Sequence, residues 1–350
     1  MRILFCGELS GKWRSGWQRC QSLKDIGNDV IEFHHERYSE NSTLIQRVSD
    51  RITGASFDEK ILERYNHDFL ETLRSVKPQV AWLEWPQMLL AGTLKKAKKE
   101  MPGCIMMSFQ DDNPFGTRSH ERPRWRRYLD AIPDYDLHFV KRQSDVIEFK
   151  KRGAKRVELF MHGFYSDLFH PVQKDTVPQS SRHDVVFVGT PHDHRVDIIN
   201  DLLMNGSFSL HVYGGHWNRT LMYYFYRSHF HSHTVNEGYV QILCGAKICL
   251  GFVSSSNKDE YTMRTFEIPA CKGFFLAERT PTHQVLFEEG KEAEFFDSAD
   301  ECAEKIKFYL ANDTAREEIA EAGYRRCIES DYSLQRRVSD AVRILEEFVS

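Results

Sequence analysis

The chain has 350 residues, of which 41% are hydrophobic and 28% charged, and its formal net charge is −4. This composition excludes an intrinsically disordered or collagen-like chain and indicates a globular protein with sizeable cores. The length exceeds that of one ordinary domain, so we expect two. No apolar run approaches the roughly 18 residues of a membrane-spanning helix, and the first residues are typical of a strand entering a glycine turn rather than of a signal peptide.

The eight cysteines form no C-x-x-C pair, and most lie within apolar segments. This pattern indicates small buried side chains in a reducing compartment rather than a disulfide framework. We therefore expect a cytoplasmic protein.

The charge is unevenly distributed along the chain. Residues 1–175 carry 29 Lys+Arg against 25 Asp+Glu, a net +4, and residues 176–350 carry 18 against 26, a net −8. Basic residues concentrate at 95–99, 118–127 and 150–156. Such runs are most often solvated helix faces, and the alternative is a first domain that meets an anionic partner.

The first half alternates short apolar runs, typical of strands, with longer stretches typical of helices. The predicted strands are 3–6, 29–33, 79–84, 104–109, 137–140 and 156–160. The predicted helices are 16–26, 58–76, 87–99 and 144–152. This alternation favours a parallel sheet with crossover helices.

The polar residues 171–183 indicate a linker, after which the same alternation restarts. The predicted strands are 184–188, 209–212, 248–252, 274–277 and 293–296. The predicted helices are 194–203, 238–246, 264–271, 299–310, 315–329 and 333–348. The sequence therefore predicts an α/β protein with two Rossmann-like, doubly wound parallel-sheet domains, whose ligands bind in the cleft facing the carboxyl ends of both sheets.

The run from Asp259 to Ala270 is the strongest candidate for chemistry, because it follows a strand and a polar loop and then opens a helix. Free backbone N–H groups at a helix start favour a phosphate, and Arg264 adds a charged fork. Glu267 lies one turn inside, at a depth suited to ribose hydroxyls, while Asp259 lies on the loop within reach of a bound sugar. The alternative is an ordinary helix in which Glu267 pairs with a neighbouring arginine.

Residues 264–281, RTFEIPACKGFFLAERTP, resemble the signature of the CgeB-like (spore maturation protein-like) glycosyltransferases of group 1. The runs 286–293 and 319–326 are similar to the same family, and the resemblance is dense over 184–337. It implies the GT-B fold, with two Rossmann-like domains facing a cleft. It also implies transfer of a sugar from a nucleotide-sugar donor, by default a UDP-sugar, without a bound metal or a tightly bound cofactor.

The resemblance also implies roles for the residues of this run. The E-x7-E element of the family aligns with Asp259 and Glu267, so that an aspartate replaces the first glutamate. Glu267 then holds the donor ribose, and Asp259 contacts the transferred sugar, with Glu260 as the alternative. The residues expected to cradle the donor diphosphate are Thr262, Met263, Arg264 and Thr265.

Three further elements resemble parts of the family. Arg195 is similar to the basic residue that neutralises the leaving phosphate. Tyr213 and Gly214 match the strand end beside the nucleotide base, with a plain turn as the alternative. Gly11 lies in the glycine loop that approaches the diphosphate, where a simple strand-to-helix turn is the alternative.

Asp111 and Asp112 end the fourth strand of the first domain. An acid at that position can take the proton of an acceptor hydroxyl, and the resemblance supports such an element, although Asp-Asp-Asn-Pro is also favourable turn chemistry. We expect no metal site, because the histidines at 229, 231 and 233 lack a partner at ligand spacing.

These assignments predict an acceptor-side domain at 1–172 and a donor domain at 173–335. A C-terminal helix at 336–350 is expected to pack back toward the first domain. The acceptor is a saccharide, a protein or modified DNA.

Two alternatives remain for the function. The basic first domain, with Trp125 among four arginines, fits a phage-type DNA glycosyltransferase that acts on a hydroxymethylated base. The aspartate at 259 favours a non-catalytic sugar- or nucleotide-binding protein. The four arginines are Arg122, Arg124, Arg126 and Arg127.

Overall fold

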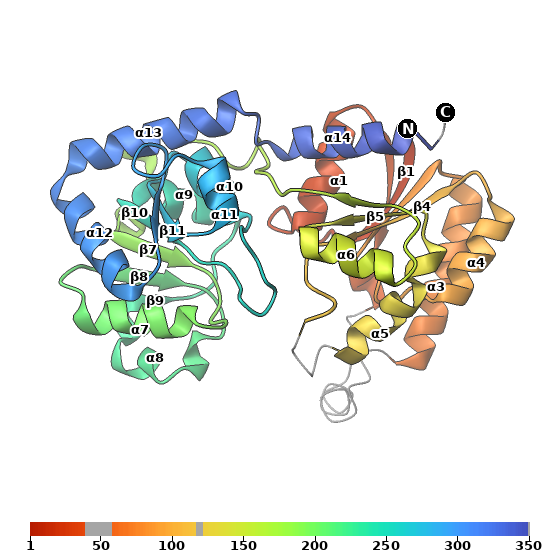
Figure 1. Ribbon diagram of the computed structural model, residues 1–350, viewed down its shortest axis with the longest axis horizontal. Helices are drawn as coiled ribbons and strands as arrows, with labels where there is room; N and C mark the ends of the chain where they lie inside the picture. The colour runs from red at the N-terminus through yellow and green to blue at the C-terminus, as the bar shows by residue number, and fades with distance from the viewer. Residues whose placement is uncertain (39–57, 117–121, 349–350) are drawn as a thin grey trace. The chain divides into compact units, whose positions relative to one another are not determined.

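The computed structural model describes residues 1–38, 58–116 and 122–348, without the side chains of residues 122–124, 174 and 205. The chain divides into two compact units, Met1–Met161 with Gln335–Ser350, and His162–Leu334. Figure 1 labels most of the helices and strands of both units. Each unit is built on a six-stranded sheet, which confirms the predicted α/β architecture of two Rossmann-like halves.

The sheet of the first unit is parallel throughout, in the order β2-β1-β3-β4-β5-β6. Its strands are β1 (Arg2–Gly7), β2 (Asp29–His34), β3 (Val80–Glu84), β4 (Ile105–Gln110), β5 (Leu137–Val140) and β6 (Val157–Leu159). Its helices are α1 (Ser15–Asp25), α3 (Glu59–Val76), α4 (Ala91–Glu100), α5 (Arg122–Ala131), α6 (Gln143–Lys151) and, from its second residue on, α14 (Leu334–Glu346).

The sheet of the second unit is also parallel, in the order β12-β11-β10-β7-β8-β9. Its strands are β7 (Val185–Val188), β8 (Leu210–Tyr213), β9 (Phe230–His231), β10 (Ile248–Gly251), β11 (Phe275–Glu278) and β12 (Glu294–Phe296). Its helices are α7 (Arg195–Asn205), α8 (Met222–Phe225), α9 (Asn236–Gly245), α10 (Arg264–Ala270), α11 (Pro281–Leu286), α12 (Ala299–Ala311) and α13 (Asp313–Glu329).

The local sequence explains why these elements form. The strands are nearly continuous apolar runs, as expected for parallel sheets covered on both faces, and β4 is buried along its whole length. Helix α3 begins where the carboxylate of Asp58 accepts the backbone N–H of Lys60 at 2.8 Å, and it ends at Lys77, which has a left-handed φ of 46°. Its apolar face packs into the first core through Leu62, Phe69 and neighbouring residues.

One predicted helix begins later than its sequence pattern suggests. The pattern predicts a helix from residue 87, whereas α4 begins at Ala91. Trp85 has a positive φ of 47° and is followed by Pro86, and the backbone N–H of Gln87 bonds to the Trp85 oxygen at 2.7 Å. This tight turn delays the helix. Among the α-helices and strands of the described residues, β9, α5, α8 and α11 were not predicted.

The chain passes from the first unit to the second between Met161 and His162, whereas the predicted boundary follows residue 172. The segment after His162 joins the second unit because Phe164 pairs with the chain before α14: its N–H bonds to the Tyr332 oxygen at 3.2 Å, and its oxygen accepts the Leu334 N–H at 2.7 Å.

Helix α14 packs on the first unit. Arg156 forms an ion pair with Glu347 at 2.8 Å, and its guanidinium lies 5.2 Å from the ring centroid of Phe348. A sulfur contact between Arg337 and Met161, at 3.7 Å, adds to this packing. The chain therefore ends in the unit in which it began.

Candidate functional site

The carboxyl ends of β7, β10 and β11 lie at one edge of the second sheet, because these strands are adjacent and parallel. The chain passes from β7 into α7, which begins at Arg195, and from β10 through a polar loop into α10, which begins at Arg264. The strand order reverses at β7, with β8 and β9 on one side and β10 to β12 on the other. Open α/β sheets bind ligands outside the strand ends at such a reversal.

Arg195 is a buried arginine with an unsatisfied donor. The residue is 7% exposed, its Nη2 donates to the Val253 oxygen at 3.1 Å, and its Nε is buried without a hydrogen-bond partner. Burial and the charge of Arg264 lower the pKa of Arg195 to about 10, against the opposing charges of Asp193 and other acids. An anionic ligand would supply both the missing hydrogen bond and the opposite charge.

Arg264 places a second guanidinium beside Arg195. Its Nε donates to the backbone oxygen of Val188 at the end of β7, which ties the start of α10 to that strand. After burial, the positive charge of Arg264 is the next largest cause of the lowered pKa of Arg195. Because like charges repel, this pair favours a ligand with more than one negative charge.

The residues that flank Arg264 differ in their surroundings. Thr265 is 1% exposed, its Oγ1 accepts the Thr262 N–H at 3.1 Å, and it shares a hydrogen bond of 2.9 Å with His283 Nε2. The Thr265 side chain therefore fixes the turn that leads into α10. Thr262 and Met263 are half-buried at the start of that helix.

Glu267 lies one turn inside α10 and is 6% exposed. The hydroxyl of Tyr239, a residue of α9 that our sequence analysis missed, donates to its Oε2 at 2.9 Å. Burial raises the pKa of Glu267, against the opposing effects of the Arg264 charge and the Tyr239 hydrogen bond. A carboxylate has more acceptor positions than this one bond uses, so Glu267 keeps capacity for the hydroxyls of a ligand.

Asp259 and Glu260 lie in different environments. Asp259 is half-buried, its N–H bonds to the Ser254 oxygen at 2.9 Å, and its charge is among those that act on Arg195. Glu260 is exposed, and its carboxylate accepts the hydroxyl of Thr282 on α11. Of the two acids, Asp259 is therefore the one whose charge acts on Arg195.

Polar residues that the sequence analysis did not assign complete this edge. The carboxylate of Asp193 accepts the Ser254 hydroxyl at 2.7 Å. Glu278, the last residue of β11, accepts the Val253 N–H at 2.6 Å and bonds to His194. Glu278 directly follows the predicted strand 274–277, and that position is the signal from which it could have been found.

The end of β8 approaches β7 closely at Gly214. A Cβ atom there would lie 2.1 Å from the Gly189 oxygen, so the contact requires glycine. Tyr213 is 8% exposed, its ring stacks on His231 at 4.4 Å between centroids, and its hydroxyl bonds to His183 at 2.7 Å. The sequence predicts a nucleotide-base contact for Tyr213, but this ring is already packed, and we do not assign it to the base.

His183, His211 and His231 form a histidine cluster with Tyr213. The rings of His183 and His211 stack at 4.0 Å, and His211 Nδ1 shares a 2.8 Å hydrogen bond with His231 Nε2. Burial lowers the pKa of all three rings, neighbouring positive charges lower it further, and that of His211 falls to about 4. Protonation of these rings is therefore expected to destabilise the folded cluster.

Acidification is expected to destabilise the second unit through His211. Because the pKa of histidine is ordinarily 6.5 and that of His211 in the folded protein is about 4, the unfolded chain takes up the proton first as the pH falls. The contribution of the neutral His211 ring to the free energy of unfolding is complete above pH 6.5 and is lost as the pH falls toward 4.

Between neutral and mildly acidic pH, the unfolding temperature of wild type should fall more than that of His211→Gln. His233→Gln, an exposed histidine of the same unit, should behave as wild type does. Equal pH dependence of wild type and His211→Gln would contradict this role.

The remaining predicted residues belong to the first unit. Gly11 lies between β1 and α1, where a Cβ atom would come within 2.7 Å of Trp13 Nε1. Asp111 and Asp112 follow β4 directly and are half-buried, and the Asp111 backbone oxygen accepts Arg142 Nη2 at 2.8 Å. All the other predicted site residues lie in the second unit.

A buried ion pair at the end of β3 was also missed. Arg19 Nη2 lies 2.8 Å from the Glu84 carboxylate, and the two side chains are 1% and 3% exposed. The guanidinium lies 4.1 Å from the ring centroid of Phe109, and Trp82 donates to Glu84 at 3.3 Å. These contacts fix α1 against the ends of β3 and β4.

Trp125 does not present its ring to solvent. It is 4% exposed and packs in the core of the first unit, 5.9 Å from the ring of Trp85. The prediction that this ring stacks on nucleic-acid bases is therefore wrong, because core packing occupies the ring. The side chains of Arg122 and Arg124 lie outside the described residues.

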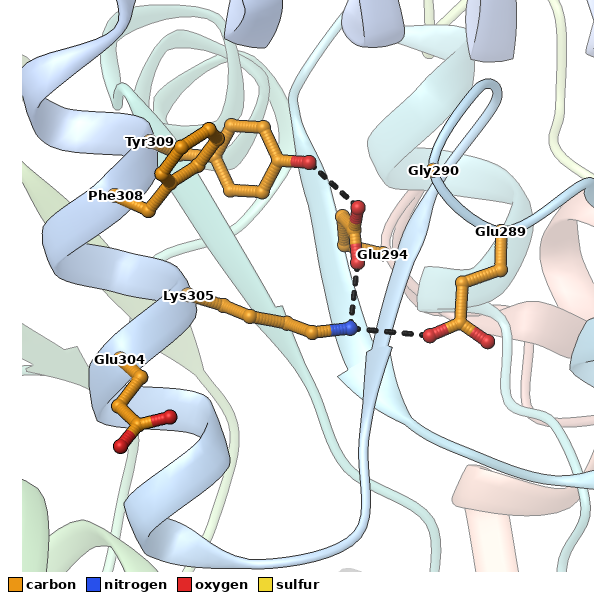
Figure 2. A pocket seen from close by; sticks show the side chains of 7 residues that line it. All are labelled: Glu289, Gly290, Glu294, Glu304, Lys305, Phe308 and Tyr309. Atoms are coloured by element: carbon orange, nitrogen blue, oxygen red, sulfur yellow. Dashed lines mark hydrogen bonds and ion pairs between the residues drawn. The ribbon is translucent and has the colours of Figure 1, made fainter.

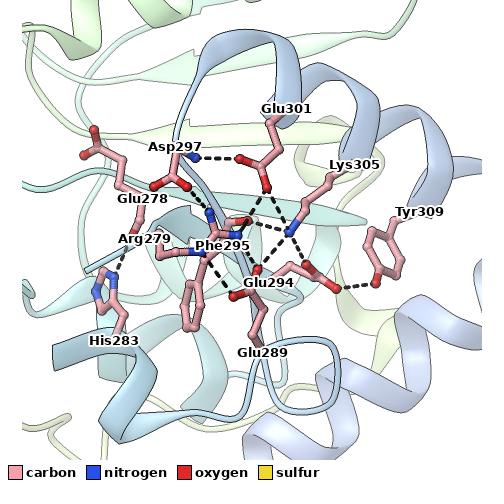
Figure 3. A network of polar contacts seen from close by, with 10 residues as sticks. All are labelled: Glu278, Arg279, His283, Glu289, Glu294, Phe295, Asp297, Glu301, Lys305 and Tyr309. Atoms are coloured by element: carbon pink, nitrogen blue, oxygen red, sulfur yellow. Dashed lines mark hydrogen bonds and ion pairs between the residues drawn. The ribbon is translucent and has the colours of Figure 1, made fainter. Parts of the chain in front are cut away.

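A polar network joins the ends of β11 and β12 to α12, as Figure 3 shows. Arg279 donates to Glu301 at 3.2 Å, and Lys305 donates to Glu289 at 3.0 Å and to Glu294 at 2.6 Å. Figure 2 shows the pocket beside this network, with a volume of about 430 Å³, and none of its lining residues is a predicted site residue. The lining residues are Glu289, Gly290, Glu294, Glu304, Lys305, Phe308 and Tyr309.

Removing the Lys305 ammonium is expected to destabilise this edge of the second unit. Burial would lower the pKa of Lys305, but hydrogen bonds to Glu294 and Glu289 outweigh it and raise the pKa. Lys305→Met leaves two partly buried carboxylates without that cation and should cost about 2 kcal/mol in urea unfolding. Lys291→Met, whose side chain is 65% exposed, is the control and should cost little. Equal effects of the two changes would contradict this account.

In the parts of the chain that the structure describes, no group of three or more His, Cys, Asp or Glu side chains is arranged to hold a metal ion. Among the same residues, no helix has both the length and the apolar character needed to cross a membrane.

Comparison with known proteins identifies the fold. A family described as glycosyl transferase-like matches residues 195–343. No curated protein sequence gives a significant match.

Sucrose-phosphate synthase from Thermosynechococcus elongatus is similar in structure over 99% of both chains, with a TM-score of 0.72 and 12% identity. Anabaena HepE in complex with UDP and glucose matches 99% of this chain and 100% of its own, with a TM-score of 0.65 and 11% identity. A glycosyltransferase from Rickettsia africae matches 100% of this chain and 98% of its own, with a TM-score of 0.66 and 12% identity. The chain has the GT-B fold.

The GT-B assignment confirms the predicted fold class. Its two Rossmann-like halves are the two six-stranded parallel sheets. The family match begins at the start of α7, after β7, and runs through the rest of the second unit into α14; it includes Arg195, Asp259 and Glu267.

Proposed function

We propose that the protein is a glycosyltransferase of the CgeB-like group, which transfers a sugar from a UDP-sugar to an acceptor hydroxyl. The observation that carries the proposal is the buried Arg195, with its unpartnered Nε beside Arg264, at the strand ends of a GT-B unit. A nucleoside diphosphate supplies the multiple negative charge that this pair lacks. HepE, a GT-B neighbour, binds UDP and UDP-glucose.

In the proposed complex, Arg195 and Arg264 bind the diphosphate, with the backbone of Thr262 to Thr265 beside them. Glu267, held by Tyr239, accepts hydrogen bonds from the ribose hydroxyls. Asp259 contacts the transferred sugar. The two guanidiniums supply the charge compensation that the diphosphate requires, and no tightly bound cofactor takes part.

In the proposed reaction, the bond between the anomeric carbon and the diphosphate oxygen breaks, and a bond forms from the acceptor oxygen to that carbon. The acceptor proton passes to a carboxylate, for which Asp111 and Asp112 of the first unit are the candidates. UDP leaves with the negative charge that develops on its terminal oxygen. In this proposal, Arg195 stabilises that charge in the transition state.

The acceptor is proposed to be a saccharide or a protein, and the enzyme is proposed to act in the cytoplasm. Modified DNA remains an alternative that rests on the basic runs of the first half. Because the ring of Trp125 is buried, it is not available to stack on bases, and this residue does not support the DNA alternative.

Release of UDP from UDP-sugars tests the proposal. The full chain is incubated with UDP-glucose, UDP-galactose and UDP-N-acetylglucosamine, with and without simple saccharide acceptors, and free UDP is measured. We expect release from one donor, faster with an acceptor, and far slower release by Arg195→Ala. Binding of UDP without release from any donor would instead favour a non-catalytic nucleotide-binding protein.

A further inference from the structure

The segment between β8 and β9, which contains α8, presents apolar side chains to solvent. Leu221, Tyr224 and Phe225 are 81%, 70% and 81% exposed, and we call these three residues the α8 patch. Leu221 has helical dihedral angles just before α8, so the three residues stand at positions i, i+3 and i+4, which share one helix face. Figure 1 places α8 at the lower rim of the second unit. The patch is thus one contiguous surface.

The opposite face of this segment is anchored in the protein. Met222 is 6% exposed in the second core, and Tyr223 packs against that core. The guanidinium of Arg227 lies 4.8 Å from the Tyr223 ring centroid. Within the α8 patch itself, the Tyr224 hydroxyl donates to the Asn218 oxygen at 3.3 Å. The core therefore holds the segment in place while the α8 patch faces water, which is unfavourable without a partner.

The charged side chains that lie nearest to the α8 patch in the chain are basic, which favours an anionic partner. The sequence contains no acidic residue between Asp201 and Glu237. The exposed Arg219 and Arg227 flank the patch on either side in the chain. An apolar tip bordered by arginines complements a surface that is anionic outside and apolar within, as a bilayer with anionic lipids is.

We propose that the α8 patch binds the surface of membranes that contain anionic lipids. Leu221 and Phe225 enter the boundary between headgroups and acyl chains, and Arg219 contacts lipid phosphates. The amphipathic ring of Tyr224 suits the headgroup region. This inference does not depend on the proposed sugar transfer, since no residue of the α8 patch belongs to the candidate site.

Sedimentation with lipid vesicles tests the proposal on the full chain. We expect binding to phosphatidylcholine vesicles that contain phosphatidylglycerol, weaker binding to phosphatidylcholine alone, and loss of binding in high salt. The double variant Leu221→Ser/Phe225→Ser should weaken binding at least about tenfold, because serine gains no favourable free energy on moving from water into the apolar part of the bilayer. Arg219→Glu should weaken vesicle binding about tenfold, because it replaces attraction to the anionic headgroups by repulsion.

Val285→Ser is the matched control, because Val285 is 77% exposed in the same unit but lies on α11. It should bind vesicles as wild type does, and unchanged unfolding temperatures should show that all variants are folded. Absence of binding to anionic vesicles, or equal binding by wild type and the double variant, would overturn the proposal. Light scattering that shows wild-type dimers and a monomeric double variant, with unchanged vesicle binding, would overturn it in favour of contact with a second copy.

Discussion

Arg195→Ala is expected to reduce the rate of sugar transfer about 100- to 1,000-fold, the effect of removing one preorganised group that stabilises developing charge. In the proposed reaction, negative charge grows on the departing diphosphate as the glycosidic bond breaks. Arg195 is buried and already held by the Val253 oxygen, so it needs little reorganisation to meet that charge. Release of UDP from the preferred UDP-sugar measures the effect.

Two further variants make this result specific. Arg195→Lys keeps the charge but loses the planar fork, so its rate should lie between those of wild type and Arg195→Ala. Arg325→Ala removes an arginine whose side chain is 63% exposed and should leave the rate unchanged. A rate for Arg195→Ala within about twofold of wild type would contradict the assigned role.

Glu267→Ala is expected to weaken UDP binding about 10- to 100-fold, because hydrogen bonds to a charged group each contribute about 1.5–3 kcal/mol. Tyr239 holds one oxygen of the carboxylate, which orients the other toward a ligand. The alanine variant also leaves the hydroxyl of the half-buried Tyr239 without this acceptor. Glu267→Gln keeps an acceptor for Tyr239 and separates loss of folding from loss of binding.

Two further variants accompany Glu267→Ala. Glu318→Ala removes an exposed glutamate of α13 in the same unit and should bind UDP as wild type does. Tyr239→Phe keeps the ring and removes the hydroxyl that positions Glu267, so its UDP affinity should lie between those of wild type and Glu267→Gln. Full affinity in Glu267→Gln would show that the carboxylate does not hold the ribose.

Most of the fold could be predicted because buried parallel strands are continuous apolar runs. The runs at 3–6 and 248–252 became β1 and β10 with nearly unchanged bounds. The start of α4 could not be predicted, because the left-handed φ of Trp85 is a tertiary feature. Strand β9 has only two residues and gives too short a pattern.

The candidate site was predictable only in part, for a related reason. Arg264 and Glu267 lie within one short run, so their spacing on a helix could be seen in the sequence. Tyr239 and Glu278 reach the site from α9 and β11, and only the strand order brings them there. Tyr213 was assigned from its place at a strand end, and the histidines that occupy its ring are distant in sequence.

We propose that the second unit binds the diphosphate of a nucleotide-sugar donor through the buried Arg195 and the neighbouring Arg264. Calorimetric titration of the full chain with UDP, in buffer without divalent metal ions, tests this most directly. We expect one UDP site per chain, weaker binding of uridine and of UMP, and binding that weakens strongly in Arg195→Ala. Absence of UDP binding, or equal binding of UDP by wild type and Arg195→Ala, would contradict it.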